Sequence, residues 1–75
     1  MSDNEIKKRL ENVLAVKTGS MGVRNEVVHV GEDRVTVRSE RTARDREVTY
    51  DQLRNAANES RNGVIVRVLA QVVGL

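Results

Sequence analysis

The sequence contains no cysteine, no proline, no phenylalanine and no tryptophan. Without cysteine, the chain can form neither disulfides nor a thiolate metal site. With Tyr50 as its single aromatic residue, it lacks the large rings that usually fill small cores and that stack on unpaired bases. We therefore expect one small domain over residues 1–75, stabilised by packed aliphatic side chains.

Long apolar segments are also missing. No apolar run approaches the ~20 residues that span a membrane, and residues 1–5 lack the cationic and apolar order of a signal peptide. These absences predict a cytoplasmic protein without a membrane partner. The charge is nearly balanced, since the sequence has 13 Lys and Arg and 11 Asp and Glu. Ten of those 13 cations are Arg, which suits bidentate contacts to phosphate or carboxylate.

The middle of the chain has the pattern of a β-meander. Val23–Val30 and Val35–Val37 are rich in β-branched residues and flank a polar turn, which predicts an antiparallel hairpin. We expect Gly31 or Asp33 to adopt the left-handed backbone conformation in this turn. Arg46–Val48 predicts a short third strand beside the second.

The N-terminal segment has helical periodicity. Ser2 and Glu5 have the spacing of a capping box, and an apolar row follows them. We expect a helix from Asp3 to Lys17 with Gly19 as its C-terminal cap. Residues 18–22 are small and polar, which predicts a loop.

The C-terminal third contains one clear helix and one ambiguous segment. Thr49 and Gln52 form a second capping box, which predicts a helix over residues 49–60. The β-branched residues of 63–73 suit a strand, yet their apolar side chains also recur at helical spacing. We favour a helix there, with Asn62 as its N-cap, and keep the strand as the alternative.

These elements together predict an α+β fold with an N-terminal helix, a small antiparallel sheet and two C-terminal helices packed on one face. The expected order is a helix at 3–17, a meander of two or three strands within 23–48, a helix at 49–60 and an apolar helix or strand at 63–73.

Residues for catalysis are scarce. His29 is the only histidine and lies between two valines in a predicted strand, so we expect it to face solvent as a surface residue. The acidic residues neighbour arginines or turns, as in ordinary surface pairing, and Gly19–Gly22 lacks the Lys-Ser/Thr ending of a phosphate-binding loop. We therefore expect no enzyme, no cofactor, no metal site and no small-molecule substrate.

An arginine segment over residues 34–46 is the strongest functional signal. Its five arginines and two acids, Glu40 and Asp45, give a local charge of +3. Such a β-arm could follow the phosphate backbone of duplex DNA, while hydroxyl groups donate to phosphate oxygens. The alternative is a set of cross-strand ion pairs without a partner. The candidate contacts are Arg34, Arg38, Ser39, Arg41, Thr42, Arg44 and Arg46.

Three quoted segments resemble a known kind of domain. The chain contains, in this order, Asp33–Thr42, Arg46–Thr49 with Leu53, and Ser60–Asn62 before an apolar C-terminal segment. This pattern is similar to that of a small DNA-associated accessory domain found in or beside restriction-type endonucleases. The resemblance covers residues 23–75 and lacks the aromatic residue expected early in the last helix. It implies a DNA-associated role and a helical C-terminus, and it brings no nuclease centre.

A protein interaction module is the alternative function. Eight of the last 12 residues are Val, Leu or Ile, more than one face of a small domain easily buries. The segment could serve a homodimer, an adaptor or a small inhibitor. The candidate interface residues are Ile65, Val68, Leu69, Val72 and Val73.

Overall fold

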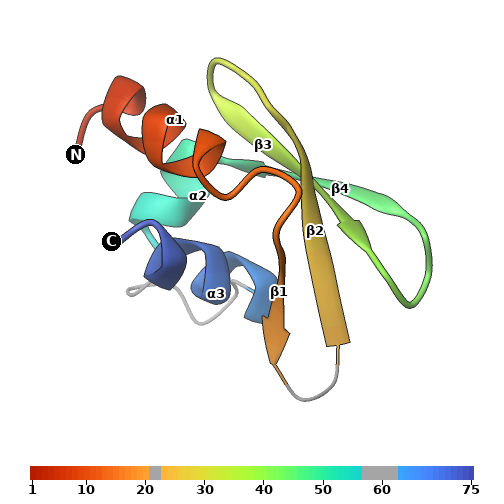
Figure 1. Cartoon of the computed structure of the whole chain (residues 1–75). Helices are drawn as coiled ribbons and strands as arrows, with labels where there is room; N and C mark the ends of the chain where they lie inside the picture. Colours follow the sequence, from red (N-terminus) through yellow and green to blue (C-terminus); the bar gives the residue numbers. More distant parts are fainter. Residues whose placement is uncertain (21–22, 57–62) are drawn as a thin grey trace.

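A computed structural model of the chain describes residues 1–20, 23–56 and 63–75. Four strands form one antiparallel sheet in the order β1-β2-β3-β4, and the described helices all lie on the same side of it (Figure 1). The predicted α+β fold is therefore confirmed. In chain order the elements are α1 (Asp3–Glu11), β1 (Lys17–Ser20), β2 (Val23–Val30), β3 (Arg34–Ser39), β4 (Asp45–Thr49), α2 (Tyr50–Arg54) and α3 (Val64–Val72).

The core lies between the helices and the sheet, and its buried side chains form a single cluster. Successive side chains of a strand point to opposite faces, so alternate valines point toward the helices. This is why the sequence of the middle segment has the pattern of a half-buried sheet. Full burial of one such aliphatic side chain stabilises the fold by about 1.5–3 kcal/mol. The fully buried members include Ile6, Leu10, Val27, Val35, Val48, Val66 and Leu69.

The first helix is shorter than the sequence predicts. It begins after Ser2, whose hydroxyl accepts a hydrogen bond from the Glu5 N–H, but it ends at Glu11 rather than near Lys17. Ala15 then adopts a positive φ of 66° and donates its N–H to the Val27 carbonyl at 2.8 Å. This residue, and not Gly19, takes the left-handed position that redirects the chain.

Strand β1 replaces most of the predicted loop at 18–22. Lys17 pairs with Glu26 and Ser20 pairs with Val23, so β1 runs antiparallel to β2. Pairing with β2 satisfies backbone groups that a loop would leave to water. Residues 21–22 lie outside the described part of the chain. The sheet therefore has one strand more than the predicted meander, whose own three strands β2, β3 and β4 are confirmed.

The turns differ from expectation in one respect. Neither Gly31 nor Asp33 has a positive φ, although the polar turn joins β2 to β3 as predicted. The left-handed residue lies instead in the β3–β4 turn, where Ala43 has a φ of 56°. Its N–H donates to the Ser39 carbonyl at 2.8 Å, which closes that turn.

The C-terminal part of the chain forms two helices, and the first begins where the sequence predicts. The capping box is present, since Gln52 N–H donates to the Thr49 hydroxyl and Thr49 N–H donates to the Gln52 side chain. Helix α2 ends at Arg54, short of the predicted end, and residues 57–62 lie outside the described part of the chain. Residues 64–72 form a helix rather than a strand, with Gly63 as its N-cap, while the predicted cap Asn62 is among the undescribed residues.

Candidate nucleic-acid interface

The sheet face opposite the helices is charged. Val35 and Val37 turn toward the core, so Arg34, Thr36 and Arg38 lie on the open face. One row across the four strands joins Lys17, Glu26, Arg38 and Asp45 in register, with charges of alternating sign. The register of the sheet therefore decides which arginine meets a carboxylate.

Arg34 is held by two carboxylates at the start of β3. Its guanidinium donates to Asp33 at 3.0 Å and to Glu47 on β4 at 3.2 Å. These hydrogen bonds raise the pKa of Arg34 and lower the pKa of the Asp33 carboxyl. Because the N–H groups on two edges of the guanidinium already donate to carboxylates, a phosphate would have to displace Asp33 or Glu47.

Arg38 is paired in the same way. Its Nε donates to Asp45 Oδ1 at 2.8 Å across the β3–β4 pair. The hydrogen bond with Arg38 lowers the pKa of the Asp45 carboxyl and raises that of the Arg38 guanidinium. Arg34 and Arg38 thus form cross-strand ion pairs of the kind that the alternative interpretation of the arginine segment predicts.

Arg41 and Arg44 are different, because they lie in the turn at the tip of the β3–β4 hairpin. We call residues 40–44 the tip; it projects away from the helices (Figure 1). Both side chains are exposed, and within the described residues neither forms an ion pair. Two guanidinium groups at the tip are thus accessible to a ligand.

The hydroxyl groups of the segment stabilise the tip. Ser39 Oγ accepts a hydrogen bond from the Thr42 N–H, and Thr42 Oγ1 accepts one from the Arg44 N–H, each at 3.4 Å. Ser39 N–H also donates to the Arg44 carbonyl at 3.1 Å. Each hydroxyl keeps its own proton, which it can still donate to a phosphate oxygen.

Arg24 joins the tip from β2, a contribution that the sequence analysis missed. The Glu40 N–H donates to the Arg24 carbonyl at 3.0 Å, which places the start of β2 beside the tip. Arg24 is exposed and, like Arg41 and Arg44, has no ion pair among the described residues. Only the strand register could have revealed it, because Arg24 lies ten residues before the arginine segment begins.

Arg46 lies on the other side of the sheet. It alternates with buried Val48, so its side chain starts from the helix face of β4. Its Nη1 is 3.2 Å from the position that a Cβ at Gly63 would occupy, next to the start of α3. The five arginines of the segment therefore do not form one surface.

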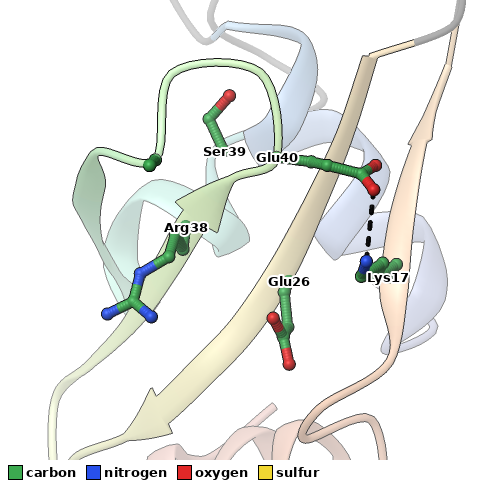
Figure 2. Close-up of a pocket in the computed structure, with 6 residues that line it drawn as sticks. Lys17, Glu26, Arg38, Ser39 and Glu40 are labelled. Carbon is green, nitrogen blue, oxygen red and sulfur yellow. Dashed lines mark hydrogen bonds and ion pairs between the residues drawn. The ribbon is translucent and has the colours of Figure 1, made fainter.

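A hollow of about 150 Å³ lies where β1, β2 and β3 meet the tip. Figure 2 shows Glu40 reaching across β2 to Lys17, with which it forms an ion pair at 3.2 Å. The pair ties the tip to β1. Glu26 and Arg38 also line the hollow, so its wall carries both signs of charge. Within the described ranges, no three His, Cys, Asp or Glu side chains gather as a metal site would require.

Three of the five residues predicted to form a protein interface are buried in the core of the chain. Ile65, Leu69 and Val73 are 8%, 0% and 2% exposed, so they belong to the core of this chain and cannot meet a partner. Val68 is half-buried and Val72 is exposed. Val64, which was not among the predicted residues, is the most exposed of the large hydrophobic residues described, at 60%.

Searches of protein-family models, of curated proteins and of solved structures find no match to this chain. The resemblance to an accessory domain of restriction-type endonucleases therefore stays a prediction. None of the helices in the described ranges has both the length and the apolar character needed to cross a bilayer.

Proposed function

We propose that the chain is a cytoplasmic, non-enzymatic binding module whose arginine tip contacts the phosphate backbone of duplex DNA. The observation that carries this proposal is the contrast in ion pairing within the arginine segment. Arg34 and Arg38 have carboxylate partners, whereas Arg41 and Arg44 at the tip and the adjacent Arg24 have none among the described residues. Exposed guanidinium groups without acidic partners suit phosphate contacts.

The shape of the tip also supports a duplex as the ligand. A turn that projects beyond the helices can lie along a groove and reach phosphates on its flanks. Single-stranded ligands need aromatic platforms on which bases stack. Tyr50, the only aromatic side chain, is 1% exposed and cannot act as one.

The experiment is a titration of a fluorescent duplex at several salt concentrations. Three phosphate contacts, from Arg24, Arg41 and Arg44, predict a slope of log K against log salt of about −2.7. Affinity should be nearly the same for duplexes of unrelated sequence, because backbone contacts carry no base information. Absence of any anisotropy change at low salt and tens of micromolar protein would reject the proposal.

Protein interaction is the second candidate function, and one observation favours it. Helix α3 is buried along one row of side chains, yet Val64 and Val72 of the same helix are 60% and 42% exposed. Apolar side chains grouped on one exposed surface often mark a contact site. This function does not depend on DNA.

A further inference from the structure

Glu40 is a carboxylate inside the basic tip, and its backbone position puts it opposite an arginine. The pairing of β2 with β3 places Asn25 opposite Ser39. The Glu40 N–H donates to the Arg24 carbonyl at 3.0 Å, so Glu40 continues this register opposite Arg24. Side chains directly opposite on antiparallel strands lie close together on one face of the sheet. By position alone, Arg24 is therefore the expected ion-pair partner of Glu40.

The carboxylate of Glu40 pairs with a different cation. Its Oε1 lies 3.2 Å from the Nζ of Lys17 on β1, and the Glu40 side chain crosses β2 to reach it (Figure 2). Arg24 forms no ion pair among the described residues. The side chains of Lys17 and Glu40 are 49% and 52% exposed, so their ion pair is a surface contact that can exchange for another at little cost.

The register between β1 and β2 explains why Lys17 competes with Arg24 for this carboxylate. The residue opposite Arg24 on β1 is Gly19, which has no side chain and leaves Arg24 without a neighbour on that strand. Lys17 lies two residues earlier, opposite Glu26, so strand alternation puts Lys17 on the same face of the sheet as Arg24. Glu40 thus has two cations on one face and pairs with the one outside the tip.

We propose that Lys17 is a positioning residue for the phosphate-binding tip, because it engages the Glu40 carboxylate and so leaves Arg24 free to contact phosphate. This inference rests on the proposed DNA-binding function and deepens it, since it names the group that controls the availability of one guanidinium. Without Lys17, the Glu40 carboxylate pairs with Arg24, and a phosphate has to break that ion pair before it binds. Lys17 itself does not contact DNA in this arrangement.

A double-mutant cycle on duplex affinity separates positioning from direct contact. Lys17→Gln should weaken binding about two- to fivefold, because an exposed ion pair of Arg24 then has to open first. Glu40→Gln should bind at least as tightly as the wild type, because the competing carboxylate is gone. In the Glu40→Gln background Lys17 can pair with Glu26 instead, so Lys17→Gln should have little further effect there.

Two further variants control for charge and for geometry. Lys8→Gln removes the same charge from an exposed position on α1 and measures the effect of net charge alone. Lys17→Arg keeps a cation that can reach Glu40 and should bind duplex like the wild type. The same loss from Lys17→Gln in both backgrounds would show that Lys17 contacts phosphate itself. That result, or a loss no larger than that of Lys8→Gln, overturns the proposal.

The change of ion-pair partner is measurable without DNA, which separates this inference from the function on which it rests. In Lys17→Gln the Arg24 guanidinium donates to Glu40, so NMR should show slower exchange of the Arg24 Nε–H with water than in the wild type. The variant that combines Lys17→Gln with Glu40→Gln should return to the wild-type rate. Slower exchange in a chain that binds no duplex would reject the DNA-binding function instead. Unchanged exchange in Lys17→Gln overturns the positioning role, even if the chain binds duplex.

Discussion

The part of the sheet beneath the helices and the part that projects beyond them use their side chains differently. Beneath the helices, Val27, Val37 and Val48 are buried against helix residues, and no charged side chain is buried among the described residues. At the projecting end, Arg41 and Arg44 are exposed and Ala43 has a left-handed backbone. The first region stabilises the fold, and the second can change its contacts at little cost to stability.

The largest expected effect belongs to the covered region. Leu53 of α2 is 1% exposed and contributes to the shared core. Leu53→Ala should lower the free energy of unfolding by about 2–4 kcal/mol, because it leaves a cavity that the neighbours fill only in part. Urea denaturation measures the change, with Arg44→Ala as the control in the projecting region. A loss equal to that of the control would show that the two regions do not differ in this way.

A smaller effect is expected at the border of the core. The Tyr50 hydroxyl donates to the Gly31 carbonyl, which ties α2 to the β2–β3 turn, and burial raises the pKa of this side chain. Tyr50→Phe keeps the packed ring and removes only the hydrogen bond, so we expect a loss of about 1 kcal/mol. Thermal unfolding of both proteins at neutral pH checks this value. An unchanged melting temperature would mean that the hydroxyl contributes nothing.

The sequence predicts well those features that depend on local patterns and poorly those that depend on pairing between distant segments, for a physical reason. Alternating valines and the Thr49 capping box are local signals, and they predicted the meander and the start of α2. Strand β1 depends on the Lys17–Glu26 pairing with β2, which no local pattern reveals. Ion pairing is likewise a matter of register, since Arg38 meets Asp45 only because β3 and β4 align as they do.

The acid dependence of stability should be modest and should come from the open face. The pKa values of Asp33 and Asp45 are lowered in the folded chain by Arg34 and Arg38. Their contribution is therefore complete above the unfolded pKa of about 3.9 and is lost as pH falls through the lower folded values. Melting temperatures between neutral pH and pH ~2 measure this loss.

Asp45→Asn is the matched variant for that titration. It lacks one of the two lowered carboxyl pKa values, so its melting temperature should fall less steeply below pH ~4 than that of the wild type. An identical acid dependence would show that the Arg38–Asp45 pair is too well solvated to contribute.

The central claim is that Arg24 and the tip arginines Arg41 and Arg44, which have no carboxylate partners among the described residues, bind phosphate, whereas the ion-paired Arg34 and Arg38 do not. The direct measurement compares the salt dependence of duplex binding by Arg44→Ala with that of Arg34→Ala. We predict that Arg44→Ala reduces the slope from about −2.7 to about −1.8 and weakens all duplex sequences alike. Arg34→Ala and Arg67→Ala, an exposed arginine on α3, should leave the slope unchanged. Equal slopes for the Arg44 and Arg34 variants would contradict the account.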